Sequence, residues 1–177
     1  MRRASLYQLT LCALFAALTS VLSPIAIPIG PIPISLGLLG VFITAITLSP
    51  LQSTATISVY LAIGLCGLPV FSGGGSGATV LVGPTGGYLW SYILVAPLVS
   101  LLSAKAKPCG FPLRSFFACL CGTLVCYLCG TLQYCLLTQA PSLSAVLVCI
   151  LPFLPFDLLK SLSAAYLGAR IKPFLNR

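Results

Sequence analysis

The sequence predicts an all-α integral membrane protein, a compact bundle of six transmembrane helices with glycine- and proline-rich extracellular loops over a pocket. Of the 177 residues, 59% are hydrophobic and only 6% are charged, whereas a soluble domain carries about a quarter charged residues. Apolar runs recur along nearly the whole chain, and the basic residues stand at the ends of these runs. One transmembrane domain, residues 1–177, is therefore expected to account for the chain.

The predicted spans are the apolar runs between helix-breaking residues. They cover residues 7–22, 34–48, 51–66, 88–102, 115–137 and 144–171. The second and third runs are shorter than the roughly 20 residues that a helix needs to cross a bilayer. We expect these two helices to tilt little, to extend into flanking loops, or to thin the bilayer locally.

The distribution of basic residues tests the number of spans independently, because Lys and Arg favour cytoplasmic loops. With six spans, both termini are predicted in the cytoplasm and the loops 24–33, 67–87 and 138–143 outside, where they carry no charge. Eight of the nine cations then lie on the inner side: Arg2, Arg3, Lys105, Lys107, Arg114, Arg170, Lys172 and Arg177. The alternative is that the N-terminal run is a cleaved signal peptide. The net charge of +8 forms no contiguous stripe, so no nucleic-acid partner is expected.

The remaining two charges, Asp157 and Lys160, belong to the sixth span. Pro152 and Pro155 interrupt that span, so a regular helix is predicted to restart near Pro155 with Asp157 in its first turn. Residues three apart share a helix face, and a charge inside a bilayer costs on the order of 3 kcal/mol. Two explanations remain open: a structural salt bridge, or a pair that contacts a polar ligand in a cavity.

Two outer loops could form the roof of such a cavity. In the loop 67–87, glycines permit positive φ angles, and their amides can hold a carboxylate or carbonyl group; the alternative is a flexible linker. The candidate ligand-binding residues of this loop and the start of the next span are Phe71, Ser72, Gly73, Gly74, Gly75, Ser76, Thr85 and Tyr88. The first loop alternates proline with isoleucine and is predicted to be a stiff apolar flap.

Other features carry weaker predictions. The chain has nine cysteines, nearly all in apolar runs, where they act as small hydrophobic residues, and no disulfide framework or metal site is expected. Ala13 and Ala17 form a small-xxx-small pair that allows close approach of another helix, within the bundle or from a partner. With one acid and no histidine, the chain lacks the groups for general acid–base catalysis, so we predict no enzymatic activity.

Five motifs, taken in order, resemble the BioY family, the biotin-specific S components of energy-coupling-factor (ECF) transporters. They are Ile27-Pro-Ile-Gly-Pro-Ile-Pro-Ile-Ser, Gly67-Leu-Pro-Val-Phe, the Gly73-Gly-Gly run, Gly83-Pro-Thr-Gly-Gly-Tyr-Leu, and Phe156-Asp-Leu-Leu-Lys. The resemblance implies a six-helix substrate-binding subunit of a bacterial cell membrane, with an outward pocket for biotin and no cofactor. It implies ligand contact by Asp157 and Lys160. The implied partners are a transmembrane coupling subunit, which packs on Ala13 and Ala17, and ATP-binding ATPase subunits.

The resemblance also suggests how biotin would bind. We expect Asp157 to accept a ureido N–H, Lys160 to hold the ureido oxygen, and loop amides to hold the valerate carboxylate, unless the ligand is reversed. Gly37 and Gly75 depart from the family pattern, which often has glutamine and asparagine there; Ser72 and Ser76 are neighbours able to compensate. The alternatives are an S component for another vitamin, such as thiamine or riboflavin, and a non-transporting scaffold.

Overall fold

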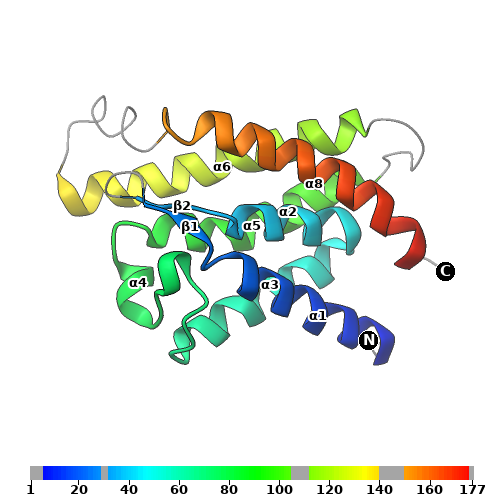
Figure 1. Ribbon diagram of the computed structural model, residues 1–177, viewed down its shortest axis with the longest axis horizontal. Helices are drawn as coiled ribbons and strands as arrows, with labels where there is room; N and C mark the ends of the chain where they lie inside the picture. The colour runs from blue at the N-terminus through cyan, green and yellow to red at the C-terminus, as the bar shows by residue number, and fades with distance from the viewer. Residues whose placement is uncertain (1–5, 29–31, 105–111, 140–149, 176–177) are drawn as a thin grey trace.

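The computed structural model describes residues 6–28, 32–104, 112–139 and 150–175, and within these ranges the chain is mostly helical (Figure 1). The long helices of the described residues are α1 (Leu6–Leu22), α2 (Gly37–Thr47), α3 (Pro50–Leu65), α5 (Gly86–Ser103), α6 (Leu113–Thr138) and α8 (Leu154–Leu175). The shorter elements are the strands β1 (Ala26–Ile27) and β2 (Ile34–Ser35), the 3₁₀ turn η1 (Ser72–Gly74), and the helix α4 (Ala78–Val82).

Each predicted span corresponds to one long helix. The first, third, fourth and fifth spans match α1, α3, α5 and α6 to within two residues at either end. Residues at the start of α3 explain why the helix begins there. Pro50 occupies the first helical turn, where its missing N–H costs nothing, and the Gln52 side chain accepts the Ser49 N–H at 3.2 Å, one half of a capping box.

The predicted start of the second span was wrong. Ile34 and Ser35 are not helical but form β2, which pairs antiparallel with β1 and places Ile27 opposite Ile34. Alternating isoleucine and proline suits an extended ribbon better than a helix. Residues 144–149 of the sixth span lie outside the described residues. Its helix α8 begins at Leu154, next to Pro155 as predicted, and continues to Leu175.

The short helix α2 forms the centre of the bundle. Ten of its eleven residues are buried, with Val41, Phe42 and Ala45 fully enclosed. It packs mainly against α8 and α5, and also against α1 and α3. Gly168 of α8 lies against Ile46 of α2, where a Cβ atom would meet the isoleucine side chain. Because it is surrounded by other helices, α2 can be much shorter than a helix that faces lipid.

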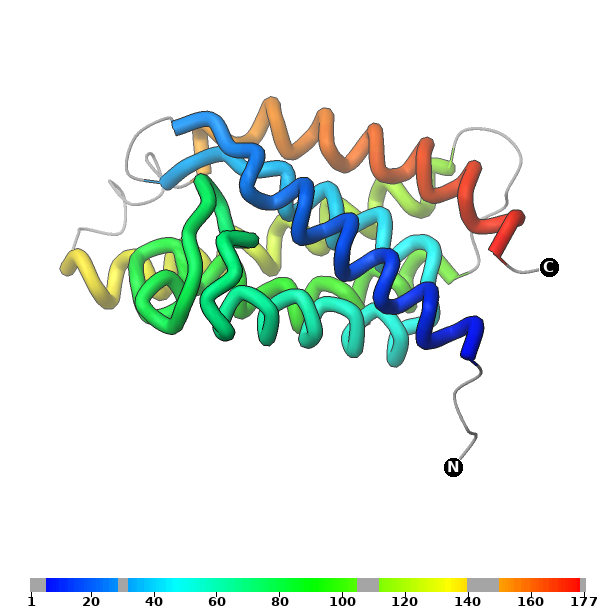
Figure 2. The backbone as a smooth tube through the Cα atoms, turned by 60° about the horizontal axis from the view of Figure 1, so that its bottom comes forward, coloured from blue at the N-terminus to red at the C-terminus, as the bar shows by residue number. Residues whose placement is uncertain are grey.

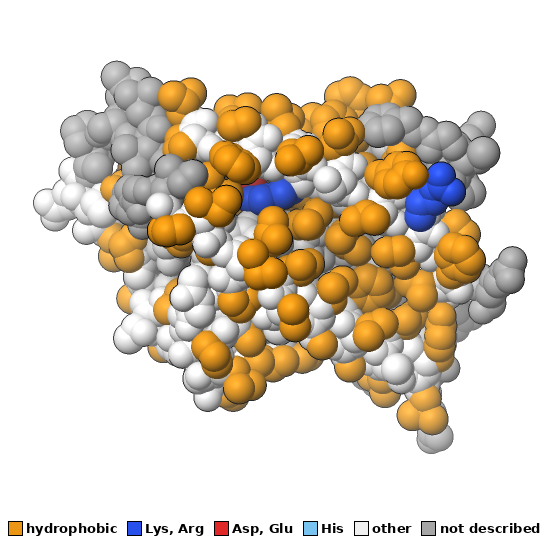
Figure 3. Space-filling model, viewed as in Figure 1, with side chains coloured by type: hydrophobic (Ala, Val, Ile, Leu, Met, Phe, Trp, Pro, Cys, Tyr) orange, Lys and Arg blue, Asp and Glu red, His pale blue; other side chains and the backbone are white. Residues whose placement is uncertain are grey.

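The outer surface of the bundle is hydrophobic (Figure 3). On α6, Leu124, Leu128, Leu132 and Leu136 recur every fourth residue, with 61 to 73% of each residue exposed. Helices α5 and α6 are long and apolar enough to cross a membrane by themselves, whereas α1 and α2 are apolar but shorter. Helix α8 includes the charged residues Asp157 and Lys160, and both are buried. The apolar exterior agrees with the predicted membrane bundle.

The two ends of the described chain lie at the same end of the bundle (Figure 2). The Tyr7 hydroxyl donates a hydrogen bond to the carbonyl of Leu175 at 3.3 Å. The β-ribbon and α4 lie at the opposite end (Figure 1). This arrangement is the one expected for an even number of membrane crossings.

Candidate ligand-binding site

The Asp157–Lys160 pair is buried in the bundle and hydrogen-bonded on both carboxylate oxygens. Only 4% of Asp157 and 7% of Lys160 is exposed. The Lys160 Nζ lies 2.7 Å from Asp157 Oδ1, and the Tyr127 hydroxyl of α6 donates to Asp157 Oδ2 at 2.7 Å. Each carboxylate oxygen accepts one hydrogen bond and has a lone pair left for a third group.

The local sequence explains where the pair stands. Because Pro155 is at the start of α8, Asp157 falls in the first turn, where the helix dipole favours a negative charge. Lys160 follows three residues later on the same face. In Figure 3 a small charged area, red beside blue, is surrounded by hydrophobic side chains.

The pair faces an internal cavity of about 50 Å³ that also receives both outer loops. Five of the predicted binding residues line it: Ser72, Thr85, Tyr88, Asp157 and Lys160. The first outer loop contributes Ile32 and Pro33. The ring of Tyr88 stacks on Phe153, with centroids 6.5 Å apart and planes inclined by 19°. The cavity therefore combines aromatic and apolar walls with a few polar groups, the usual composition of a small-molecule site.

The cavity is much smaller than the roughly 300 Å³ at the low end of ordinary ligand pockets. A ligand of vitamin size must therefore displace part of the wall. The two outer loops supply wall residues Ile32, Pro33 and Ser72, and loops move more easily than packed helices. Binding of such a ligand thus requires rearrangement at the loop end of the bundle.

The structure separates the predicted residues of the glycine loop into two groups. Ser72 reaches the cavity, and its Oγ atom is buried without a hydrogen-bond partner. Gly73, Gly74, Gly75 and Ser76 do not line the cavity. Gly73 and Gly74 have φ angles of 67° and 79°, which favour glycine, and a Cβ atom at either position would meet nothing within 4 Å. The loop is therefore a folded turn with a polar side chain directed inward.

Phe71 lies in the core and not at the cavity wall. It is fully buried and packs edge-on against Tyr60, with ring centroids 5.8 Å apart at 84°. Its ring occupies the space left by Gly64, where a Cβ atom would collide with it. The Tyr60 hydroxyl donates to the carbonyl of Val70 at 3.2 Å. Phe71 thus anchors the start of the glycine loop to α3.

Comparison with known proteins identifies the family. The sequence model of the BioY family matches residues 1–177. The chain belongs to the BioY family. The biotin transporter BioY2 of Lactococcus lactis is 37% identical over 168 residues, which cover 95% of this chain and 91% of that protein. The biotin transporter BioY of Thermotoga maritima is 37% identical over 165 residues, 93% of this chain and 95% of that protein.

A solved structure agrees with the fold. The crystal structure of the S-component for biotin from an ECF-type ABC transporter matches with a TM-score of 0.86 and 27% identity, covering 94% of this chain and 90% of that chain. The predicted fold class, an all-helical membrane bundle of the S-component type, is confirmed. The similar proteins are transporters, which confirms the prediction that this BioY-family chain is not an enzyme.

The structure shows the surroundings of Gly37 and Gly75, the two positions where a departure from the family pattern is expected. A Cβ atom on Gly37 would lie 2.8 Å from Ser23 Oγ and 3.2 Å from Ser35 Oγ. A larger side chain at Gly37 would therefore displace the Ser23 hydroxyl, and the neighbouring Ser35 lines the cavity. At Gly75, a Cβ atom would lie 3.1 Å from the Val80 side chain. Of the two serines expected to compensate, Ser72 reaches the cavity wall and Ser76 does not.

Sequence reasoning missed several cavity residues, namely Ser35, Tyr92, Tyr127 and Phe153. Tyr92 of α5 and Ser35 of β2 line the same cavity. A signal was available for Tyr127. A tyrosine in the middle of an apolar span must find a partner for its hydroxyl when buried, and Asp157 is the sole acid in the sequence.

The first helix presents the predicted small-residue pair to the outside. Ala13 and Ala17 are exposed on α1, whereas the intervening Phe15 and Ala16 are buried in the bundle. The pair is thus not used for packing within the described bundle. Another helix could approach α1 closely on this face.

A larger groove of about 620 Å³ lies between α6 and α8. Half of its lining residues are leucines, including the exposed Leu124 and Leu128. Asp157 and Tyr127 border both this groove and the internal cavity. The smaller internal cavity is the better candidate for a ligand site, because Lys160, Ser72, Ser35 and Tyr88 reach it as well.

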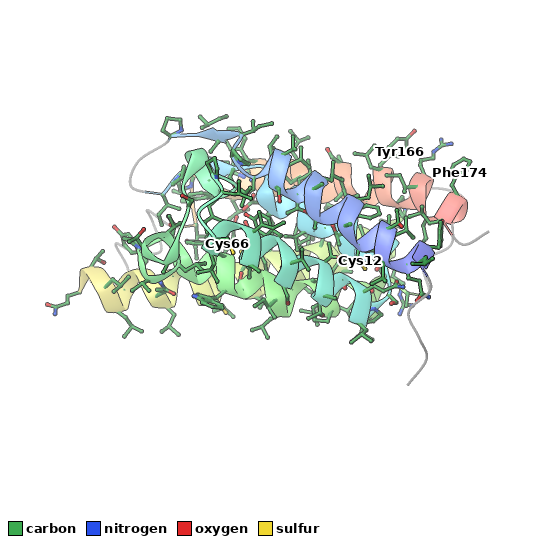
Figure 4. The ribbon with its side chains drawn as sticks, turned by 90° about the horizontal axis from the view of Figure 1, so that it is seen from below. Cys12, Cys66, Tyr166 and Phe174 are labelled. Carbon is green, nitrogen blue, oxygen red and sulfur yellow. The ribbon has the colours of Figure 1, made fainter. Side chains whose placement is uncertain are left out.

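Cysteines and metal ligands give no competing site in the part of the chain that the structure describes. Its seven cysteines are free, and no group of three or more His, Cys, Asp or Glu residues could hold a metal ion there. Figure 4 shows Cys12 and Cys66 well apart along the bundle.

Proposed function

We propose that this BioY-family chain is the biotin-binding S component of an ECF-type vitamin transporter in a bacterial cell membrane. It takes up biotin from outside and releases it inward when partner subunits rearrange the complex. The observation that carries the proposal is the buried Asp157–Lys160 pair, with Tyr127, at a cavity that both outer loops close. The similar proteins are named as biotin transporters or as an S-component for biotin, and this supports biotin as the ligand.

The charged pair suits the ureido group of biotin, which offers two N–H donors and one carbonyl oxygen. Each carboxylate oxygen of Asp157 accepts one hydrogen bond and has a lone pair left for a ureido N–H. Lys160 has donors left for the ureido oxygen. The aromatic walls formed by Tyr88 and Phe153 match the apolar faces of the fused rings.

The valerate carboxylate would be held at the loop end of the cavity. Ser72 provides a buried hydroxyl without a partner, and Thr85 lines the same wall. Gly74 and Gly75 already donate their N–H groups to backbone carbonyls within the loop. Binding of a carboxylate by these two amides would therefore require the loop to exchange internal hydrogen bonds for ligand contacts.

The end of the bundle with the chain termini would face the cytoplasm. Arg114 at the start of α6 donates from Nε to the carbonyl of Leu102 at 2.6 Å, and Arg170 lies over the ring of Tyr166 at 5.4 Å. Figure 4 shows Tyr166 and Phe174 on the part of α8 nearer that end. Basic residues are typical of the cytoplasmic side of a membrane protein, and exposed aromatic rings are typical of either membrane interface.

The partners would be an ECF transmembrane coupling subunit and ATP-binding ATPase subunits. The exposed Ala13 and Ala17 of α1 would form the face that contacts the coupling subunit. Energy for inward release would come from the ATPase subunits.

The proposal is tested by calorimetric titration of biotin into the purified chain in detergent, with thiamine and riboflavin titrated in parallel. We expect tight binding of biotin alone. The Asp157→Asn and Lys160→Met variants should lose it. Each single change leaves a buried polar group without its partner, at a cost of about 3 to 5 kcal/mol in stability when a buried ion pair is broken.

The double variant Asp157→Asn with Lys160→Met separates binding from folding. Replacing both charges is often nearly neutral for stability, so the double variant should remain monodisperse and still fail to bind. Biotin binding by that variant would mean that the pair is structural. Binding of another vitamin by the unmodified chain, in place of biotin, would reassign the substrate.

A further inference from the structure

Gln133 connects α6 to the segment that precedes α5. From α6, its side-chain Nε2 donates to the carbonyl of Leu81 at 3.0 Å and to the carbonyl of Gly83 at 2.8 Å. A glutamine amide has two N–H donors, so both are used on this one segment. Gln133 itself is half-buried.

The two carbonyls belong to the C-terminal end of α4. That helix has five residues, too few to be stable alone, and the last carbonyls of a helix lack partners within it. Gln133 supplies a side-chain partner for the carbonyls of Leu81, within α4, and Gly83, just after it. It therefore caps α4 from a neighbouring helix.

The turn after α4 lies very close to α6. A Cβ atom on Gly86 would lie 2.6 Å from Gln133 Nε2, and one on Gly87 would lie 2.8 Å from Gln133 Cβ. The same turn carries Thr85 and leads to Tyr88, and both of these residues line the internal cavity. A displacement of the turn away from α6 would therefore move that wall of the cavity.

We propose that Gln133 is a positioning residue for ligand binding, which holds the α4–α5 turn so that Thr85 and Tyr88 keep their places in the cavity wall. The inference rests on the proposed biotin site and assigns to it a residue that does not line the cavity. Gln133 acts through the backbone carbonyls of Leu81 and Gly83 and not through contact with the ligand.

The test uses three chains: the unmodified protein, Gln133→Met and Gln133→Glu. Methionine has a similar length and no donor. We expect Gln133→Met to weaken biotin binding about tenfold, since two hydrogen bonds are lost. The control is Leu136→Ala, which alters an exposed residue of the same helix and should leave the affinity unchanged.

The Gln133→Glu variant gives a readout that a packing role alone would not produce. A carboxylate would face two carbonyl oxygens and repel them, whereas a protonated carboxyl group could donate one hydrogen bond. Relative to the unmodified chain, its affinity should recover as the pH falls from about 7 to about 4, through the ordinary pKa of a glutamate carboxyl group. Among the residues that surround Gln133 in the groove between α4, α5 and α6, Cys129 is the one other ionisable side chain.

Hydrogen–deuterium exchange of the chain without biotin separates this inference from the proposed function. In Gln133→Met, the amides of residues 78–88 should exchange faster while those of α2 and α8 remain unchanged. Unchanged exchange in 78–88, or undiminished biotin affinity in Gln133→Met, would overturn the inference. Failure of the unmodified chain to bind biotin would overturn the proposed function, and the exchange measurement would still decide whether Gln133 holds the turn.

Discussion

At the scale of single residues, the candidate site depends on the hydrogen bonds that Asp157 accepts. Lys160 and Tyr127 both donate to Asp157, from different helices. One partner was visible in the sequence because it lies three residues away on the same helix face. The other comes from α6, thirty residues earlier in the chain.

Tyr127→Phe tests the role of that second donor. Loss of the hydroxyl removes the hydrogen bond to Asp157 Oδ2 and leaves the carboxylate free to turn away from the ligand. We expect biotin affinity to fall about tenfold, measured by calorimetry. Tyr166→Phe, at an exposed position of α8, is the control and should bind normally. Equal affinity of Tyr127→Phe and the unmodified chain would exclude this role.

Gly64→Ala tests the anchor of the glycine loop. The added methyl group would collide with the ring of Phe71, and overpacking of this kind costs about 1 to 3 kcal/mol. We expect a lower melting temperature in detergent. The exposed Ser58→Ala substitution on the same helix should have little effect. A Gly64→Ala chain as stable as the unmodified one would show that Phe71 can leave its place at no cost.

At the scale of elements, the sequence predicted the helices of the bundle, because a bilayer requires long apolar runs. The apolar length of each run located six helices, and Pro155 marked the start of α8. The sequence did not show which face of each helix points into the bundle. In water a polar face indicates the outside, but a lipid-facing surface is as apolar as the core. The inward direction of Tyr127 and Phe71 therefore depends on tertiary packing.

The outer face of α1 provides a test at the element scale. Ala17→Trp would place a large ring where a partner helix must approach closely, so copurification of the coupling subunit should be lost while biotin binding is retained. Leu124→Trp, on the exposed face of α6, is the matched control and should copurify normally. Normal copurification of Ala17→Trp would place the docking face on another helix.

At the scale of the whole molecule, charge and loop chemistry divide the bundle into two ends. The β-ribbon and α4 lie at one end, and the two ends of the described chain at the other (Figures 1 and 2). The described cations Arg114, Arg170 and Lys172 stand near the latter end, at the start of α6 and toward the end of α8. The positive-inside rule therefore predicts that the β-ribbon and the glycine loop lie outside the cell.

Two single-cysteine chains test this orientation in intact cells. The first chain keeps the exposed Cys66 at the end of α3, and its other cysteines are replaced by serine. In the second chain, Cys66 is replaced as well, and Phe174→Cys adds a cysteine near the end of α8. The residue at this position is 73% exposed. A membrane-impermeant thiol reagent should label Cys66 directly and the second chain only after permeabilisation, because six crossings put these positions on opposite sides. The reverse labelling pattern would mean that the bundle has the opposite orientation in the membrane. The loop end, with the cavity at Asp157 and Lys160, would then face the cytoplasm. That orientation is incompatible with capture of a vitamin from outside.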